Sequence, residues 1–149
     1  MEAVKLLNGL RQKTLRLQSL EAELKSLDED DIPGARAIQY DPDKVQSSPK
    51  QDGLENMVID YVNKKDEIKI KILHLSIEML QERYEAIYYI NHIESTDQRE
   101  VLHLRYIKCY AWWDILKTRG CDDLRSQMRL RDRAIESLQK IIDDPTITP

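Results

Sequence analysis

The chain has 149 residues, of which 34% are charged, with four glycines, no phenylalanine and a net charge of −4. This length allows one domain, or one small domain with an extended helical arm. The composition favours a helix-rich soluble protein over a β-sandwich or a disordered chain, so we predict an all-α fold.

Residues 1–28 are predicted to form an N-terminal helix. Its leucines follow alternating spacings of four and three residues, interrupted at Lys13, as in the seam of a coiled coil. These leucines are Leu6, Leu10, Leu17, Leu20, Leu24 and Leu27. The helix is expected to end in the acidic run 28–31, because a helix does not continue through the Pro33-Gly34 pair that follows.

Residues 29–52 are predicted to be a linker. The stretch is polar, has no apolar periodicity and is punctuated by Pro33, Gly34, Pro42 and Pro49. Such a composition is typical of a loop or a partly ordered connector. It indicates no chemistry of its own.

A long helix is predicted over residues 53–94. A first apolar row follows a heptad spacing, with Lys65 as its exception, and consists of Leu54, Val58, Tyr61, Ile68, Ile72, Leu75 and Met79. A second row consists of Val62, Leu73, Ile77, Leu80, Tyr84 and Ile87. An isolated helix cannot leave two such rows in water, so either the N-terminal helix folds back along it, or a second subunit covers it, or both. We favour both, which gives a coiled-coil-like arm and a homo-oligomer formed through that arm.

Residues 95–144 are predicted to form a helix-turn-helix domain. We expect helices at about 97–107, 111–118 and 124–142, with a turn at Gly120 before the last one. The expected N-caps are Ser95 or Thr96 for the first of these helices and Asp122 or Asp123 for the last.

Two adjacent tryptophans, Trp112 and Trp113, lie in the middle helix of this domain. Neighbouring side chains on a helix point about 100° apart, so only one of the two can point into the core. We expect Trp113 to belong to the core and Trp112 to be partly exposed, packed on the long helix or on a partner. A stacking platform for single-stranded nucleic acid would need several spaced aromatic residues, which this sequence lacks.

The last helix has two faces of different character when it is projected at 100° per residue. One arc is apolar and holds Leu124, Met128, Leu130, Ala134, Ile135, Leu138, Ile141 and Ile142. Arg125, Arg129 and Arg133 fall on the opposite side, one turn apart. Residues 97–142 carry a net charge of +3, whereas residues 1–96 carry −5. Such a helix can pack on one face and lie on a phosphate backbone or in a major groove with the other. The alternative is the solvated face of an ordinary amphipathic helix.

The candidate DNA-binding residues are Arg125, Gln127, Arg129, Arg131 and Arg133. The arginine row can contact phosphates, and Arg125 or Gln127 can reach base edges, because Arg and Gln pair with guanine and adenine. Gln127 lies nearer the packed side. Arg131 falls inside the apolar arc, from which we expect its aliphatic stem to carry the charge out to water.

The sequence indicates no enzyme. No nucleophile and base recur at a suitable spacing, and there is no Gly-rich phosphate loop, so we expect neither a cofactor nor a catalytic site. Cys109 and Cys121 lack the spacing of a metal site and are expected to be reduced thiols of a cytoplasmic protein. No stretch approaches the roughly 18 apolar residues of a membrane span, so no membrane partner is expected.

Several segments of the end domain carry a family resemblance. Gln98–Ile107, Trp113–Leu116, Gly120 and Arg129–Ile135 together resemble the C-terminal domain of the ArpU/RinA-like phage regulators, which itself resembles region four of sigma factors. In the linker, Asp43–Pro49 resembles a segment that related phage proteins carry between a leading coiled coil and a second long helix.

The resemblance implies a DNA-binding transcriptional regulator of a phage or prophage, typically an activator of late genes, in the cytoplasm of a bacterial host. Its partner would be double-stranded DNA. The alternative is a non-enzymatic adaptor whose helix-turn-helix docks on RNA polymerase or on another phage protein. The overall acidity of the chain favours that alternative.

Overall fold

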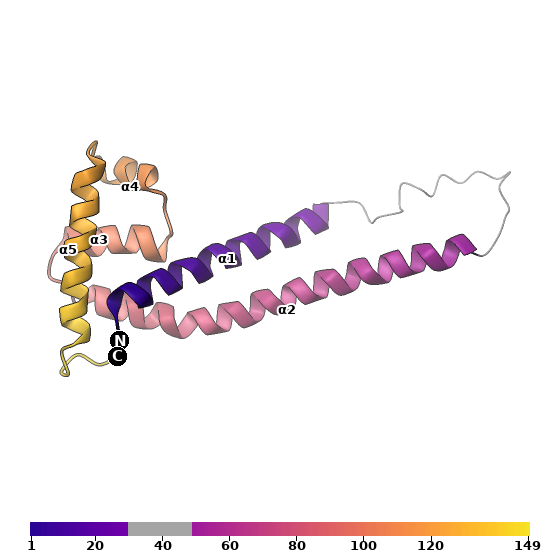
Figure 1. Cartoon of the computed structure of the whole chain (residues 1–149), viewed down its shortest axis with the longest axis horizontal. Coiled ribbons are helices and arrows are strands. Elements are labelled where there is room, and N and C mark those ends of the chain that lie inside the picture. The colour runs from indigo at the N-terminus through magenta and orange to yellow at the C-terminus, as the bar shows by residue number, and fades with distance from the viewer. Residues whose placement is uncertain (30–48) are drawn as a thin grey trace. The chain divides into compact units, whose positions relative to one another are not determined.

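The computed structural model describes residues 1–29 and 49–149, and within these residues all regular structure is helical (Figure 1). The helices are α1 (Ala3–Glu29), α2 (Pro49–Asn91), α3 (Thr96–Leu102), the short π-helix η2 (His103–Ile107), α4 (Trp112–Arg119) and α5 (Leu124–Ile142). The predicted all-α fold is confirmed. None of the helices in the described ranges has an apolar stretch long enough to cross a lipid bilayer.

The start of α2 corrects the predicted linker. The helix begins at Pro49, so residues 49–52 are helical and not part of a 29–52 connector. Proline suits the first position of a helix, because the N–H that it lacks would have no partner there. The connector predicted for residues 30–48, including most of the Asp43–Pro49 segment, lies outside the described residues.

The chain folds into two compact units. We call Met1–Arg16 together with Ser76–Pro149 the head unit, and Leu17–Leu75 the arm unit. Both α1 and α2 contribute residues to each unit. The head unit therefore contains more than the predicted 95–144 domain, because the first part of α1 and the last part of α2 are built into it.

In the arm unit, α1 packs along α2. The Tyr61 hydroxyl donates a hydrogen bond to the Leu27 carbonyl, and Lys65 forms an ion pair with Asp28. Lys65, the one residue that interrupts the first apolar row, thus has a charged partner on α1. The expected hairpin of α1 on α2 is present, while the predicted coiled-coil packing stays a prediction.

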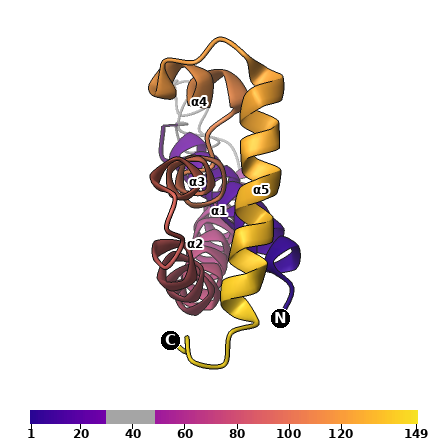
Figure 2. The ribbon, with the colours of Figure 1, turned by 90° about the vertical axis from the view of Figure 1, so that its left-hand side faces the viewer.

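The core of the head unit is made by all of its helices. Figure 2 shows α5 running beside α3, with α4 next to the N-terminal end of α5, and α3 and α5 are in direct contact. The large side chains that are completely buried are Leu7, Leu10, Ile90, Val101, Leu102, Ile115 and Leu138. Polar contacts tie the two chain ends together: Gln139 accepts a hydrogen bond from the Ala3 backbone N–H at 2.7 Å and donates one to the Met1 carbonyl at 3.1 Å.

Among the described residues, the second apolar row of α2 is exposed except for Ile87, which is half-buried. In the head unit, Ile77, Leu80 and Tyr84 are 63%, 71% and 69% exposed, and in the arm unit Val62 and Leu73 are also exposed. The first row behaves in the opposite way, since its residues are buried or half-buried in both units. One chain therefore covers only one of the two predicted rows.

The segment from α3 to η2 corresponds to the helix predicted at 97–107. It begins at Ser95, whose side chain accepts a hydrogen bond from the Gln98 N–H, so the first of the two expected N-caps is the one used. His103 opens η2 and is half-buried. Burial lowers the pKa of His103, and the nearby cations Lys108 and Arg99 lower this pKa further.

This lowered pKa predicts a pH-dependent stability. Below the ordinary histidine pKa of about 6.5, the unfolded chain takes up a proton that folded His103 resists, so stability falls as the pH decreases. His103→Gln should reduce the fall in Tm between pH 7 and pH 5, measured by thermal unfolding. His74→Gln, which changes an exposed histidine of α2, is the control and should keep the fall. Identical profiles for H103Q and the unchanged protein would contradict this assignment.

Candidate nucleic-acid interface

The turn between α4 and α5 is built for a change of direction. Gly120 has a positive φ of 65°, a left-handed conformation that glycine adopts without steric cost. The Cys121 N–H then bonds to the Leu116 carbonyl at 2.9 Å and closes the end of α4. Asp123 caps α5, accepting a hydrogen bond from the Arg125 N–H at 3.0 Å, so the second of the two expected caps is the one used.

The arginine row lies on the exposed side of α5. Arg125, Arg129 and Arg133 are all exposed, whereas Ala134 and Leu138 are completely buried. A spacing of four residues advances only about 40° around a helix, so the three guanidinium groups form one ridge. None of the three forms an ion pair within residues 1–29 and 49–149.

Two of the acidic residues near this ridge, Asp123 and Asp132, are engaged elsewhere, whereas Glu136 is exposed on the same side of the helix. Asp123 is the N-cap of α5, and Asp132 accepts two hydrogen bonds from the Arg131 guanidinium, at 2.7 and 3.0 Å. These carboxylates therefore do not form ion pairs with the ridge. The ridge keeps its positive charge and its hydrogen-bond donors for a partner.

Gln127 is not available to such a partner. It is only 5% exposed, and its side-chain oxygen accepts a hydrogen bond from Arg119 Nε at 2.9 Å. From this position the side chain cannot reach a base edge, so the predicted contact of Gln127 with DNA is corrected. Its role is structural, because the amide fixes the first turn of α5 to the end of α4.

Arg119 is the centre of this packing, and sequence reasoning missed it. Its side chain is 7% exposed and forms ion pairs with Asp97 at 3.1 Å and with Glu100, both on α3, besides its bond to Gln127. One guanidinium thus joins α3, α4 and α5. No local pattern indicates this, since the two acidic partners lie 22 and 19 residues away in the chain.

Arg131 lies on the packed side of α5, as its place in the apolar arc predicts. Its side chain is 28% exposed, and its guanidinium carbon lies 5.5 Å from the centre of the Trp112 ring. Arg105 of η2 lies over the same ring at 4.9 Å. Arg131 is therefore placed apart from the exposed ridge and among other groups.

The prediction is wrong for Trp113 and holds for Trp112, which was expected to be partly exposed. Trp113, expected in the core, is 78% exposed, and Trp112 is half-buried. The reason is the register of α4, whose buried residues are Ile115 and Leu116. Trp112 lies three and four residues before this pair and shares its face, whereas Trp113 is turned about 160° from Ile115.

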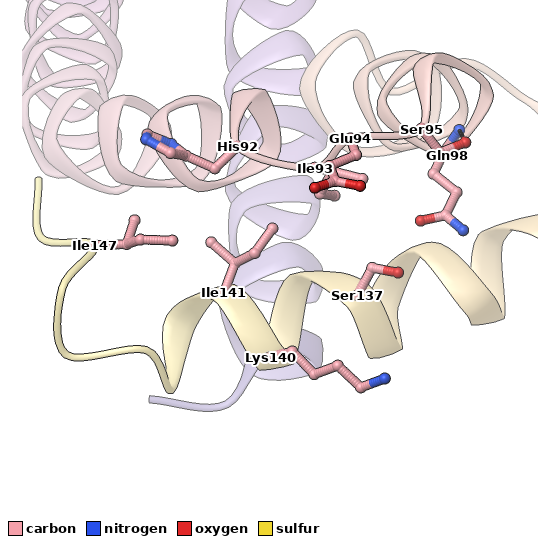
Figure 3. Close-up of a pocket in the computed structure, with 9 residues that line it drawn as sticks. All are labelled: His92, Ile93, Glu94, Ser95, Gln98, Ser137, Lys140, Ile141 and Ile147. Carbon is pink, nitrogen blue, oxygen red and sulfur yellow. Dashed lines mark hydrogen bonds between the residues drawn. The ribbon is translucent and has the colours of Figure 1, made fainter.

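A pocket of about 710 Å³ lies at the other end of α5. Figure 3 shows its lining side chains, which come from the connection between α2 and α3, from α3, from the last turns of α5 and from Ile147 of the tail. Its charged residues, Glu94 and Lys140, have opposite signs, so it offers no net attraction to an anion. Within the described ranges no group of His, Cys, Asp and Glu is arranged to hold a metal ion, and Cys109 and Cys121 are both free thiols.

Comparisons with known proteins identify no relative: no family model, no curated protein and no solved structure matches this chain. The chemical features of the head unit are therefore the basis for assigning a function. Three free guanidinium groups on one helix face can bind a row of phosphates, because each presents planar N–H donors to phosphate oxygens.

The contacts of Arg119 predict its contribution to stability. Arg119→Ala should lower the free energy of unfolding by about 2–3 kcal/mol, less than for a fully buried pair because Asp97 and Glu100 are partly exposed. The loss arises because the buried Gln127 amide would lose its partner. Urea unfolding measures the change. Lys117→Ala, which removes an exposed cation from the same helix, should be close to neutral, and an equal effect of both substitutions would refute the role of Arg119.

Proposed function

We propose that this protein is a transcriptional regulator of a phage or prophage that binds duplex DNA in the bacterial cytoplasm. In this proposal α4, the Gly120 turn and α5 act as a helix-turn-helix, and the N-terminal half of α5 lies on the DNA. The observation that carries the proposal is the exposed row of Arg125, Arg129 and Arg133 on the side of α5 that faces away from the core, which forms no ion pair with any residue of 1–29 or 49–149. The resemblance to ArpU/RinA-like regulators supports it and suggests activation of late genes.

The three arginines have different parts in this proposal. Arg129 and Arg133 contact phosphates, which fix the register of the helix on the duplex without reading sequence. Arg125, in the first turn of α5, is the residue best placed to enter the major groove, where a guanidinium pairs with the O6 and N7 atoms of guanine. Specificity therefore rests on Arg125, while affinity rests on the whole row.

The exposed face of α2 is proposed to form a homo-oligomer. Ile77, Leu80 and Tyr84 of the head unit leave a large apolar surface on α2 in water, and such patches mark sites of association. Their spacing of three and four residues is that of a helix seam that pairs with another helix. The first row of α2 is buried or half-buried, whereas Ile77, Leu80 and Tyr84 are exposed among the described residues, and a second copy of the chain would cover them.

A second candidate function is docking on RNA polymerase or another phage protein. The observation that favours it is Trp113, which is 78% exposed on α4. Exposed tryptophans are enriched among residues that dominate protein–protein binding energy. In this alternative the helix-turn-helix presents α4 to a protein, and the arginine row of α5 is a solvated face.

The DNA-binding proposal predicts the behaviour of a double variant. Arg125→Ala with Arg129→Ala should abolish binding to phage promoter fragments in a gel shift without changing the thermal unfolding profile, because both side chains are exposed and unpaired. If about four to six phosphates are contacted, the slope of log affinity against log salt for the unchanged protein should lie near −4 to −5. Lys140→Ala, in the last turn of the same helix, is the matched control and should bind almost normally.

Two outcomes separate the candidates. Unchanged affinity of the double variant would remove the proposed contact. Absence of DNA binding by the unchanged protein, together with retention on RNA polymerase that Trp113→Ser abolishes, would establish the docking alternative instead.

The oligomer proposal is tested by placing a charged side chain on the exposed apolar face of α2. Leu80→Glu should convert the protein to a monomer in analytical ultracentrifugation, because it places a carboxylate in the middle of the uncovered apolar face. Gln12→Glu adds the same charge to an exposed position of α1 and should leave the mass unchanged. If the unchanged protein is already monomeric at about 0.1 mM, far above the Kd of a typical specific complex, the second-copy hypothesis is rejected.

A further inference from the structure

A second cavity of the head unit, with a volume of about 650 Å³, is lined by residues of α3, η2 and α4. Its volume falls within the range of about 300–1,000 Å³ that is usual for the binding sites of small molecules. Apart from Leu104, every residue that lines the cavity has a polar side chain. Three of these residues, Arg99, His103 and Lys108, are basic, and Glu100 is acidic.

The backbone places the three basic residues in successive turns. The His103 N–H bonds to the carbonyl of Arg99, four residues earlier, as in an α-helix. The Lys108 N–H bonds to the carbonyl of His103, five residues earlier, at 2.9 Å, which is the pattern of a π-helix. In a continuous α-helix, Lys108 would be turned about 140° away from His103. The π-turn therefore brings Lys108 to the cavity that Arg99 and His103 line.

The chain is distorted at the point where this turn ends. Cys109 has a positive φ of 57°, a left-handed conformation that is unfavourable for a residue with a Cβ atom. Short π-turns and residues in such backbone conformations are both frequent at functional sites. The distortion here serves two neighbouring residues, since Ile107 stays buried while the exposed Lys108 lines the cavity.

The two permanent cations of the cavity have no acidic partner. Neither Arg99 nor Lys108 forms an ion pair within residues 1–29 and 49–149. Arg99 donates to two neutral oxygens, the Ile93 carbonyl at 2.7 Å and the Thr96 hydroxyl at 3.3 Å. Its charge and that of Lys108 are therefore available to an anion in the cavity.

The acidic residue of the lining does not cancel this charge. Glu100 forms its ion pair with Arg119, whose side chain is almost completely buried. His103 is half-buried, and the charges of Lys108 and Arg99 add to burial in lowering its pKa, so the imidazole is neutral at pH 7. The cavity thus offers two free cations and a neutral imidazole to a ligand.

We propose that this cavity binds a small molecule through a terminal phosphate group, held by Arg99 and Lys108 beside His103. A phosphate monoester carries nearly two negative charges at pH 7 and has three acceptor oxygens. The guanidinium of Arg99 can bind two of these oxygens with its remaining N–H groups, and the ammonium of Lys108 acts as a point charge. The Thr96 hydroxyl, which accepts its bond from Arg99, keeps its own proton for the ligand. None of these residues belongs to α5, so the site goes beyond the proposed DNA contact.

Binding of inorganic phosphate to the full chain, followed by NMR at pH 7 and constant ionic strength, tests the site. We expect saturable binding with a Kd in the millimolar range. Lys108→Ala should weaken this binding about tenfold, because a charge-assisted hydrogen bond is lost, whereas Lys108→Arg should retain most of it. Lys117→Ala removes an exposed lysine of α4 that does not line the cavity and should bind phosphate normally. Equal affinities of K108A and K117A would overturn the proposal.

The imidazole of His103 shows where the phosphate binds. A phosphate beside Arg99 and Lys108 offsets their charges, so the pKa of His103, measured by NMR titration, should rise when phosphate is added. The pKa of His74, an exposed histidine of α2, should not change. A pKa of His103 that phosphate leaves unchanged would place the bound anion elsewhere and reject the site.

Two further comparisons identify the ligand class and exclude the α5 row. Dimethyl phosphate, which has the single charge of a nucleic-acid backbone phosphate, should bind at least about tenfold more weakly than inorganic phosphate, and equal binding would contradict a terminal phosphate. Arg125→Ala with Arg129→Ala should leave phosphate binding intact, and its loss would transfer the binding to α5. Absence of saturation by the unchanged protein up to about 50 mM phosphate would reject the cavity as a phosphate site, whatever the outcome of the DNA-binding experiments.

Discussion

The orientation of α5 depends on one buried polar contact, the hydrogen bond between Arg119 and Gln127. Arg119 ends α4, and its guanidinium also reaches Asp97 and Glu100 of α3. Because the contact lies in the first turns of α5, it determines which side of that helix faces the core. The exposed arginines follow from this choice, since a helix that buries Gln127 must turn positions 125 and 129 roughly 160° away from it. A charged and an amide side chain therefore reinforce the face that the apolar arc of α5 also buries through Ala134 and Leu138.

The other end of α5 is held by a different polar residue, Gln139, through Ala3 and Met1. The two glutamines act at opposite ends of one helix, and both use amides, which accept and donate without adding charge. Apolar contacts between them, such as that of the completely buried Leu138, supply the larger part of the stability. The two amides restrict how α5 is oriented on its neighbours, because a hydrogen bond forms only within a narrow range of distances and angles.

The features that were predictable from the sequence are local ones. The cap of α3 joins Ser95 to Gln98, and that of α5 joins Asp123 to the next-but-one residue, so short patterns reveal both. The contacts of Arg119 span about twenty residues and that of Ala3 spans 136, and no periodicity carries such information. Gln127 is an intermediate case. At 100° per residue it falls between Ala134 and Leu138, at the centre of the apolar arc, so its burial was visible in the projection although its polarity suggested the surface. The prediction for Trp113 was wrong because the sequence does not show which side of α4 faces the core. In the structure that side is the one with Ile115 and Leu116.

The distribution of charge follows from the same packing. The chain is acidic overall, yet several of its carboxylates near α5 act as a cap, as a partner of Arg131 or as partners of Arg119. Each such contact engages a carboxylate with a group other than Arg125 or Arg129, although Asp97 and Asp132 stay largely exposed. Surface ion pairs contribute little to stability, so leaving these arginines unpaired costs the fold little. A free cation, in contrast, gains a strong interaction when a phosphate approaches, because counterions are released from the nucleic acid. An acidic protein can in this way keep a locally cationic face, provided that acids close to that face are engaged by other groups.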